Sequence, residues 1–596
     1  MGEKGRAYEF FEIATSGLKM SAKMHAYVFM GCFFLHMLVF VMIVAATWSN
    51  NRLNSLTFVV AKIASLTWPD KAVTLAVFDD QNRRTKLHVR TILKNYAGSA
   101  KKQGVIVAVL FVLSGAVYVA YPFMINLFKQ KAREKTGREH VRGSRQINID
   151  EFNRQFKQNG EQPGYHLGDI RMPKRAHNRG TAIAGISGSG KTTCVKPVLY
   201  DMKKNKEKAI VYDYKGDLVS EFYDPRTDYI FNVVDERCVK WSVFNEIKTL
   251  TDIEALAWSN VPDRPNSNPF WEAGVRNILA GGLLYNYFNG KKTNQHIWDF
   301  ICTPNKKMIE MLGSVKGTEP ALKTLGECKG DSRQADGLHA VMMQYCRCYD
   351  YLTRLEGGFS IKDWVENGEG FIFVTNYEDI SFVLRPILSL FIDLAIQKLL
   401  SLPDSDGRIV NFVFDEFGTL QRLNIPRLIR GGRSKGSQLF LCFQDRQQLL
   451  DVYGDKETKS MENNLANRLV FRLTGDDAKY ESQVMIKNTE YIKYERAYSM
   501  GPDDHSDRMN MSPRKYVEPL FLDSDIARLK DLTAIVKIAD YDYLISAWPY
   551  RPPAVNHPPL VFRKDLTLDA VVGDQHRMAQ DLEDADISYG PGFIQN

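Results

Sequence analysis

A glycine-rich run at residues 185–193, GISGSGKTT, has the residue types and spacing of a phosphate-binding loop. It matches the pattern GxxxxGK[ST] in full, and it follows a short apolar stretch, residues 181–184, that predicts a buried strand. The glycines let backbone N–H groups turn inward around phosphate oxygens, because no side chain obstructs them. Lys191 can direct a positive charge toward the β- and γ-phosphates, and the Thr192 hydroxyl can ligate Mg²⁺. We therefore predict that ATP and Mg²⁺ bind here, through Gly185, Ser187, Gly188, Ser189, Gly190, Lys191, Thr192 and Thr193.

A pair of acids after a second apolar run carries a related signal. Residues 409–414, IVNFVF, are followed at once by Asp415 and Glu416. This is the Walker B pattern, in which an acid at the carboxyl end of a strand reaches the Mg²⁺ shell. We predict that Asp415 holds the metal through water, together with Thr192, and that Glu416 polarises the attacking water. Considered alone, the pair is equally compatible with a solvated strand end, but a complete phosphate-binding loop in the same chain favours hydrolysis.

Gln444 and a basic loop are further candidates for catalysis. Gln444 follows the apolar run 438–443, where a polar side chain can sense the γ-phosphate; a simple strand-end glutamine is the alternative. Between the two runs lies RLIRGGRSKG, residues 427–436. Ring ATPases place an arginine so that it reaches the γ-phosphate of the neighbouring subunit. We predict that Arg433 has this role, with Arg430 in reserve, while an exposed basic loop remains the alternative.

The elements that must position these residues predict an α/β fold. Apolar runs at 209–212, 371–375 and 469–473 add strands to those already described, giving a largely parallel sheet. The predicted core is a RecA-like P-loop ATPase domain.

An insertion is expected between the phosphate-binding loop and the acid pair. Their separation, 415 − 191 = 224 positions, is far more than a minimal core of this kind requires. Residues 250–360 look helical, because large apolar residues recur there at i, i+3 and i+4 spacing. These residues are Trp271, Val275, Ile278, Leu279, Leu283 and Tyr287. We therefore predict an inserted all-α domain over 250–360.

Two long uncharged stretches precede the nucleotide loop. Residues 26–48 contain no acid, lysine or arginine, and His36 is their only basic side chain; residues 104–128 contain no charge. A helix needs about 20 apolar residues to cross a bilayer, so we predict a two-helix transmembrane anchor with a periplasmic loop, 49–103. Basic residues after the second span indicate a cytoplasmic side, although the loop is basic as well. ATP is cytosolic, which places both termini there, and we expect His36 to contact the other helix rather than relay protons.

Composition sets only broad limits. The 596 residues have room for a large core and an appended domain. A net charge of +8 is compatible with a polyanionic partner but does not demand one. No base-stacking or groove-reading motif is visible in the sequence. The residues therefore predict a membrane-anchored ATPase, and they do not by themselves name its substrate.

Beyond the nucleotide loop, several segments resemble the TraD-type coupling ATPases of bacterial conjugation, which belong to type IV secretion systems. The matching segments are IVYDYKGDLVSEFY, DERCVKWSVFNEI, FWEAGVRNILAGGLLY, FVFDEFGTLQRL, GGRSKG and LFLCFQDRQQL. The resemblance covers about residues 20 to 545, and it includes Asp213 and Lys215, whose chemical role we leave unassigned.

This resemblance implies a homo-hexameric ring at the bacterial inner membrane. Such a ring would receive relaxase-bound, single-stranded DNA from relaxosome proteins and drive it toward type IV secretion channel proteins. Two alternatives remain open: an FtsK-type chromosomal DNA translocase, and an ATP-dependent receptor for secreted proteins.

The predicted domain boundaries follow from these segments. They are a cytoplasmic tail, 1–25; the anchor, 26–128; a basic linker, 129–165; the RecA-like domain, 166–249 and 361–545; the all-α domain, 250–360; and a C-terminal tail, 546–596. The tail begins proline-rich and ends with an acidic group, Asp581, Glu583, Asp584 and Asp586. Such tails can dock relaxosome proteins in the family, but we expect a solvated terminus here.

Overall fold

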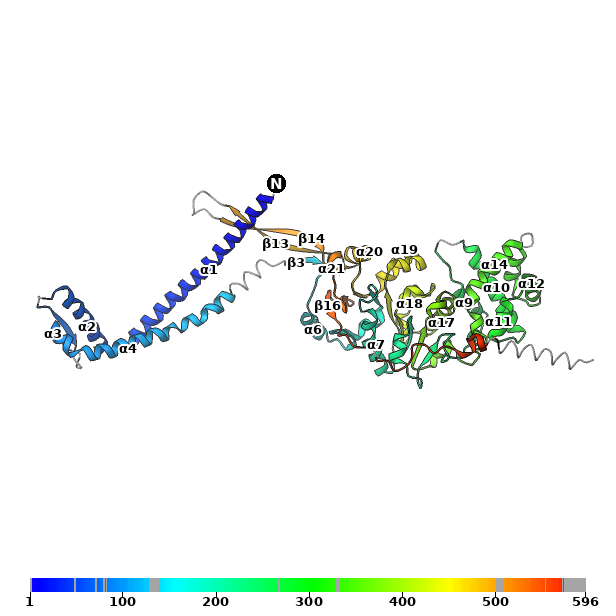
Figure 1. Ribbon diagram of the computed structural model, residues 1–596, viewed down its shortest axis with the longest axis horizontal. Coiled ribbons are helices and arrows are strands. Elements are labelled where there is room, and N and C mark those ends of the chain that lie inside the picture. The colour runs from blue at the N-terminus through cyan, green and yellow to red at the C-terminus, as the bar shows by residue number, and fades with distance from the viewer. Residues whose placement is uncertain are drawn as a thin grey trace, which may run out of the picture. The chain divides into compact units, whose positions relative to one another are not determined.

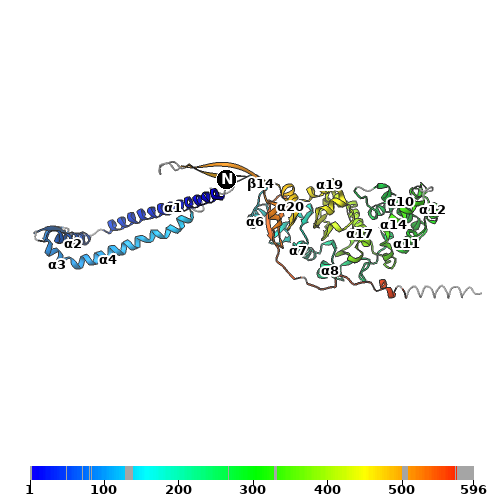
Figure 2. The same ribbon diagram turned by 45° about the horizontal axis from the view of Figure 1, so that its top comes forward.

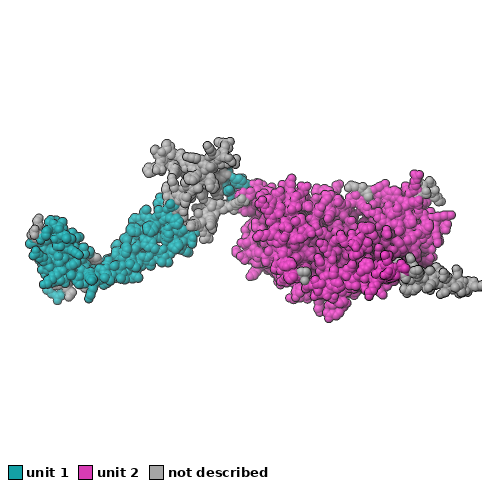
Figure 3. All heavy atoms as spheres, in the orientation of Figure 1, with its two compact units in different colours: residues 1–139, 492–516 teal, residues 140–491, 517–596 magenta. Residues whose placement is uncertain are grey.

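The computed structural model describes most of the chain. The described residues are 3–47, 50–69, 72–78, 81, 83–127, 139–265, 268–327, 332–499, 508–552, 554–570 and 572. They fall into two compact units, residues 1–139 with 492–516 and residues 140–491 with 517–596 (Figure 3).

The first unit contains two helices that are long and apolar enough to cross a membrane. The apolar stretches are His25–Ala46, within helix α1 (Glu3–Ala46), and Ala97–Leu127, which includes α4 (Ala97–Ser114) and η1 (Gly115–Val119). Both overlap the predicted spans, although the second begins seven residues before the predicted residue 104. His36 Nε2 lies 3.1 Å from the Phe111 carbonyl oxygen. The expected contact of His36 with the other helix is confirmed.

The predicted loop at 49–103 contains regular structure. Helix α2 (Asn50–Thr67) is followed by an antiparallel pair, β1 (Thr74–Phe78) and β2 (Arg84–His88), and by α3 (Val89–Asn95). Their apolar side chains gather into a small core of Ala61, Ala64, Val77, Val89 and Ile92. A stretch that separates two apolar helices in the sequence is therefore a packed subdomain.

A nine-stranded sheet forms the centre of the second unit. Its strand order is β16-β15-β12-β6-β11-β10-β7-β9-β8. The strands are β6 (Thr181–Ala184), β7 (Lys208–Asp213), β8 (Tyr229–Phe231), β9 (Phe371–Thr375), β10 (Val410–Phe414), β11 (Ser437–Phe443), β12 (Asn467–Val470), β15 (Thr533–Lys537) and β16 (Leu544–Ala547). Seven strands from β12 to β8 are parallel, and only β15 and β16 run antiparallel to their neighbours. The predicted largely parallel sheet is confirmed.

Helices surround this sheet and fill the predicted insertion. Those outside the insertion are α6 (Ile149–Gln158), α7 (Lys191–Lys204), α8 (Asp217–Phe222), α16 (Ile361–Asn367), α17 (Ser381–Ser401), α18 (Ile425–Gly431), α19 (Arg446–Asn464), α20 (Gly475–Tyr480) and α21 (Asp523–Ala527). Those inside it are α9 (Leu250–Asn260), α10 (Pro269–Phe288), α11 (Asn294–Ile301), α12 (Asn305–Gly313), α13 (Glu319–Glu327), α14 (Ser332–Cys346) and α15 (Tyr349–Leu352). Among the described residues from 250 to 360 there is no strand, and α10, α11, α12 and α14 lie together in both views (Figures 1 and 2).

Smaller strands complete the described structure. A two-stranded sheet joins β4 (Pro163–Leu167) to β5 (Ile170–Pro173), and a three-stranded sheet has the order β14-β13-β3. The latter strands are β3 (Glu139–Gly143), β13 (Asn488–Ser499) and β14 (Arg508–Pro519).

The predicted linker at 129–165 differs from the structure. Residues 128–138 lie outside the described residues, but 139–165 include β3, α6 and most of β4. Phe152 and Tyr165 are fully buried, and the Tyr165 hydroxyl donates to Gln438 Oε1 at 2.6 Å. The basic residues of this segment suggested a linker, but its aromatic side chains Phe152 and Tyr165 pack into the core of the second unit. The chain therefore joins that core well before residue 166.

Two boundaries near the other end of the sheet also change. The strand predicted at 469–473 is β12, which ends at Val470. Beyond it, the Arg472 carbonyl oxygen accepts a hydrogen bond from Ile186 N of the phosphate-binding loop at 2.9 Å. The predicted tail starts inside β16 and then stays attached, since Arg563 is buried and its Nη1 donates to Val233 O at 2.7 Å. The acids at 581–586 lie outside the described residues.

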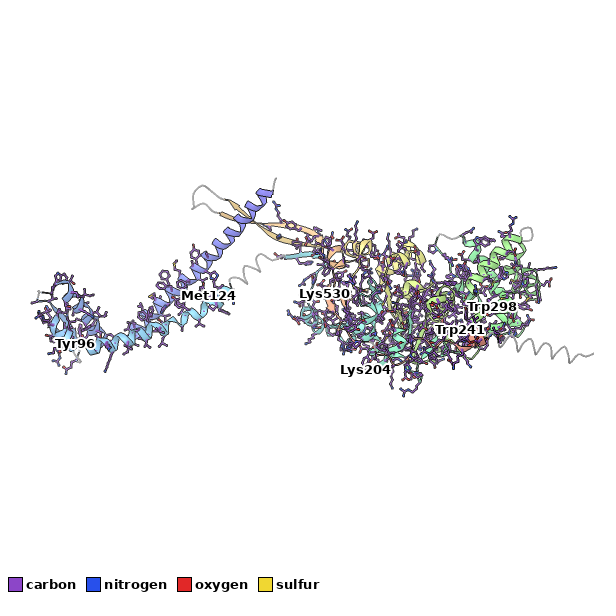
Figure 4. The ribbon with its side chains drawn as sticks, viewed as in Figure 1. Tyr96, Met124, Lys204, Trp241, Trp298 and Lys530 are labelled. Carbon is purple, nitrogen blue, oxygen red and sulfur yellow. The ribbon has the colours of Figure 1, made fainter. Side chains whose placement is uncertain are left out.

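Trp241, labelled in Figure 4, joins the sheet to the surrounding helices. Its ring meets Phe231 of β8 and Phe391 of α17 edge-on, each at 5.5 Å between centroids. Its Nε1 donates to the buried carboxylate of Glu246 at 2.8 Å, which also accepts from the Ile361 backbone N–H at the start of α16. One side chain therefore contributes apolar burial and a hydrogen bond that orients a buried acid.

We expect Trp241→Ala to destabilise the second unit by about 3–5 kcal/mol, because it leaves a large cavity and removes a donor from Glu246. Urea unfolding followed by circular dichroism should show a clearly lower midpoint than in the wild type. Phe288→Ala is the control, since this aromatic side chain is 61% exposed. Equal midpoints for the two variants would contradict the assigned role of Trp241.

Candidate nucleotide-binding site

The phosphate-binding loop connects β6 to α7 with the backbone that such a loop needs. Gly188 and Gly190 have φ of +76° and +114°, a left-handed region that side chains disfavour. A Cβ at Gly190 would also lie 2.8 Å from Leu532 Cδ2. Gly185 is constrained by space instead, because a Cβ there would lie 2.6 Å from Ser189 Oγ. The glycine spacing seen in the sequence thus has a separate steric cause at each position.

Thr192 and Asp415 bring the loop and the acid pair together. Thr192 Oγ1 donates to Asp415 Oδ1 at 2.8 Å, although the two residues are 223 positions apart in the chain. Lys191 Nζ donates to the carbonyl oxygens of Gly185 and Ile186, at 2.8 and 3.1 Å. The lysine therefore stands within the loop, next to the position where phosphate oxygens would lie.

Glu416 and Gln444 form a second pair at the same edge of the sheet. Gln444 Nε2 donates to Glu416 Oε2 at 2.5 Å. Gln444 follows β11 and Glu416 follows β10, and these strands are parallel neighbours with Phe414 opposite Leu441. Because parallel strands end at the same edge, the strand order itself brings these side chains together.

A cavity of about 370 Å³ collects most of the predicted residues. It is lined by Ser187, Gly188, Gly190, Lys191, Thr192, Thr193, Asp415, Glu416 and Gln444. Gly185 and Ser189 do not line it; Ser189 Oγ donates to Ile186 O at 2.7 Å and so holds the loop from behind. The predicted residues therefore divide into those facing the cavity and those supporting the loop.

Five further residues line this cavity and were not predicted as ligands: Lys215, Asp217, Asp531, Leu532 and Tyr550. Lys215 and Asp217 come from the DYKGD segment, to which the sequence alone assigned no chemical role. Leu532 N donates to Ser189 O at 2.9 Å, so the loop before β15 braces the phosphate-binding loop. No local pattern marks the last three residues, because β15 and β16 bring them to the site from more than 300 positions away.

The charges in the cavity fit a bound cation and a polyphosphate. Burial raises the pKa of both Asp415 and Glu416, and burial lowers the pKa of Lys191. Each group is thus in an environment that disfavours its own charge, and opposite charges from a ligand would relieve this. Thr192 and Asp415 offer the hard oxygen atoms that Mg²⁺ prefers. The donor set therefore fits a magnesium nucleotide.

Asp213 is a buried acid that shapes the same edge of the sheet. Its carboxylate accepts from the backbone N–H groups of Gly216, Leu218 and Val219, at 3.0, 2.8 and 2.8 Å. It thereby fixes the turn that carries Lys215 into the cavity. Burial outweighs these hydrogen bonds and raises the pKa of Asp213 to about 7.

Arg433 and Arg430 lie away from this cavity. Both line a separate cavity of about 400 Å³ with Asn178 and Arg179, residues that precede β6. Arg433 comes before β11, whereas Gln444 follows it. A seven-residue strand spans on the order of 20 Å. The two arginines therefore lie at the opposite edge of the sheet from the nucleotide loop of their own chain.

Comparison with protein families identifies the chain. Residues 164–543, well over half of the sequence, match the family model of the type IV secretion-system coupling protein DNA-binding domain. The chain belongs to this coupling-protein family. The match covers the nine-stranded sheet up to the penultimate strand and all of the helical insertion, and the resemblance seen in the sequence is confirmed.

Individual relatives agree with this assignment. The coupling protein TraD of Escherichia coli strain K12 is 25% identical over 427 residues, which are 70% of this chain and 59% of TraD. This coupling-protein chain therefore spans about 59% of the length of that curated relative.

Solved structures support the fold. The bacterial conjugative coupling protein TrwBΔN70, unbound, has a TM-score of 0.62 at 24% identity over 72% of this chain and 97% of its own. The plasmid coupling protein TrwB in complex with ADP and Mg²⁺ has a TM-score of 0.61 at 23% identity over 72% and 98%. The predicted fold, a P-loop α/β core with a helical insertion, is confirmed.

The raised pKa of Asp213 predicts a pH-dependent stability. An unfolded aspartate has a pKa of about 3.9, so between pH ~4 and ~7 the folded chain holds a proton that the unfolded chain releases. The free energy of unfolding should therefore fall as pH rises through this window, and Asp213→Asn should remove that fall.

Urea unfolding in EDTA, without nucleotide, at pH 5 and pH 8 measures this effect. We expect the stability of Asp213→Asn relative to the wild type to be higher at pH 8 than at pH 5. The loss of one carboxylate oxygen as an acceptor lowers the free energy of unfolding equally at both pH values, so it does not contribute to this difference. Asp299→Asn, at an exposed acid on α11, is the control. If Asp213→Asn showed the same difference in unfolding free energy between pH 5 and pH 8 as the wild type, the interpretation would be contradicted.

Proposed function

We propose that this protein is an inner-membrane coupling ATPase of bacterial conjugation. It links a relaxase–DNA complex to a type IV secretion channel and pumps single-stranded DNA by ATP hydrolysis. Family membership supports the coupling role, and the hydrogen bond between Thr192 and Asp415 is the observation that carries the ATPase assignment. It joins the two halves of one nucleotide site across 223 positions of the chain.

In this proposal each residue of the cavity has a distinct task. Lys191 leaves the loop carbonyls for the β- and γ-phosphates, and Thr192 and Asp415 hold Mg²⁺, which neutralises charge developing on the phosphates. Glu416 accepts a proton from the attacking water, and Gln444 keeps that carboxylate oriented. The buried surroundings that raise the pKa of Glu416 also favour its action as a base near neutral pH.

The membrane topology and assembly belong to the same proposal. The two apolar helices span the inner membrane, with both termini in the cytoplasm and the α2–α3 subdomain in the periplasm. Six copies form a ring, and Arg433 reaches the nucleotide of the adjacent subunit. The position of Arg433 at the edge of the sheet remote from its own nucleotide cavity supports action across an interface. The all-α domain, 250–360, meets DNA or relaxosome proteins first, and the acidic tail at 581–586 is a solvated terminus.

ATP turnover by the purified protein, with and without DNA, tests the function. We expect single-stranded DNA to stimulate turnover, Lys191→Ala to abolish it, and Glu416→Gln to lower it by about 10²-fold or more while ATP still binds. Lys204→Ala, at the other end of α7 (Figure 4), is the control and should remain active. Stimulation by a secreted protein and not by DNA would replace this function with that of a protein receptor.

Mixing variants tests the arginine. Arg433→Ala should lose about 10³-fold or more of turnover, because transition-state charge is no longer neutralised. Mixed with Lys191→Ala, it should regain activity, since some interfaces then pair an intact arginine with an intact loop. Arg430→Ala serves as the neighbouring control. If no mixing ratio restores turnover, Arg433 does not act across the interface.

A further inference from the structure

A polar cavity separate from the nucleotide site lies in the second unit between the helical insertion and the loop that follows Glu416. Its volume is about 420 Å³. The residues that matter for its chemistry are Arg264, Tyr345, Phe382, Arg385, Gln421 and Arg422. They come from four different parts of the chain: the segment before α10, α14, α17, and the loop before α18. Such a convergence of polar and aromatic groups suggests a ligand site.

Among the residues that the structure describes, no acid forms an ion pair with Arg385. Its Nη2 donates to the backbone oxygen of Leu420 at 2.6 Å, while its buried Nε has no hydrogen-bond partner among the residues that the structure describes. Burial lowers the pKa of Arg385, and the charge of Arg264 contributes in the same direction. A buried, unpaired guanidinium donor is costly unless a ligand completes its hydrogen bonds. An anion is the ligand that would do so.

Two acids line this cavity. Asp263 pairs with Arg276 at 2.8 Å, whereas Asp451 accepts from the neutral Gln447 Nε2 at 2.9 Å and keeps its charge. Gln421 offers the opposite polarity, because its buried Oε1 has no donor within the described part of the chain. The site is therefore open to a ligand that has both an anionic group and a hydrogen-bond donor.

Aromatic rings lie beside these charges. Phe382 is 74% exposed and stands three positions before Arg385 on α17, which places both on one helix face. The Arg264 guanidinium carbon lies 5.1 Å from the centre of the Tyr345 ring. An exposed ring next to guanidinium groups is the combination that binds single-stranded nucleic acid, through base stacking and phosphate contacts.

A short segment of the chain, from Glu416 to Gln421, connects this cavity to the nucleotide site. Leu420, which Arg385 contacts, is four residues after Glu416, and between them the Thr419 hydroxyl lies 2.8 Å from the Tyr212 hydroxyl of β7. Gln421 N donates to Ser389 Oγ of α17 at 2.9 Å. A ligand that moves Arg385 would therefore act on the short segment that orients Glu416.

We propose that this cavity binds one nucleotide step of single-stranded DNA. Arg385 and Arg264 take the phosphodiester oxygens, Phe382 stacks on the base, and Gln421 accepts from a base N–H group. A duplex keeps its bases stacked inside the helix and cannot offer a free base face to Phe382. This inference rests on the proposed function and adds to it the place where the cargo touches the motor.

Oligonucleotide binding to the full chain in lipid nanodiscs tests the proposal. With a fluorescein-labelled oligo(dT), we expect Phe382→Ala to weaken binding about tenfold, in line with the contribution of one stacked base. Phe288→Ala, another exposed phenylalanine on a helix, is the matched control and should bind like the wild type. Arg385→Gln should reduce the slope of log affinity against log salt by about 0.7, the loss of one phosphate contact.

Two further measurements distinguish binding of DNA from binding of free phosphate. An oligonucleotide containing 2-aminopurine should lose its fluorescence on binding to the wild type and recover it with Phe382→Ala. Equal oligonucleotide affinities for Phe382→Ala and Phe288→Ala would overturn the proposal. Inorganic phosphate that, at equal ionic strength, displaces the oligonucleotide equally from the wild type and Phe382→Ala would also overturn it, and would indicate a simple phosphate site.

The outcomes also separate this inference from the function on which it rests. If single-stranded DNA neither binds the wild type nor stimulates its ATP turnover, the proposed function itself fails. If DNA does both, and Phe382→Ala and Arg385→Gln respond as the wild type does, only the DNA site is wrong. Phe382 is exposed, so Phe382→Ala should unfold at the same urea midpoint as the wild type. An unchanged midpoint shows that a loss of binding comes from the missing ring and not from a less stable protein.

Discussion

The contact between Thr192 and Asp415 depends on the order of three parallel strands. β6 carries the phosphate-binding loop, β10 carries the acid pair, and β11 lies between them with Gln444 at its end. Because all three end at the same edge, side chains from three distant segments face one cavity. Gln444 reaches Glu416 because β11 is the direct neighbour of β10. The site is therefore a property of strand order more than of any single element.

The cavity is built with charges that are not compensated by the protein alone. Lys191, Asp415 and Glu416 are all buried, and burial shifts the pKa of each toward the neutral form. Such groups destabilise the empty fold, and a magnesium nucleotide would offset that cost by supplying the missing charges. Binding energy is then available to order the loops around the site, including the segment at Leu532 that braces the phosphate-binding loop.

The same sheet has a basic loop at its other edge. The arginines of the basic loop lie where β6 and β11 begin, remote from the cavity where these strands end. In a ring of identical subunits, an edge of this kind can complete a neighbour's site, which makes hydrolysis depend on assembly. α17 and the segment after Glu416 line the Arg385 cavity, so a ligand there would act on the segment that carries Glu416.

The local features of this protein could be read from its amino-acid sequence. The glycine spacing, the acid pair after an apolar run and the two uncharged stretches each rest on interactions between neighbours in the chain, and each has its structural counterpart. Helical spacing likewise revealed α10 and its surroundings, because an amphipathic pattern needs no knowledge of the partner.

Which distant residues share a cavity depends on the folded arrangement of the strands and helices. Asp531, Leu532 and Tyr550 reach the nucleotide site because β15 and β16 extend the sheet beside β12. Arg433 was predicted to act on the nucleotide of a neighbouring subunit, and only the fold shows that it lies away from the nucleotide cavity of its own chain. Tyr165 anchors a segment that looked like a linker, since burial depends on what packs against a residue. These facts follow from strand order and packing, which bring together positions hundreds of residues apart and leave no local trace in the sequence.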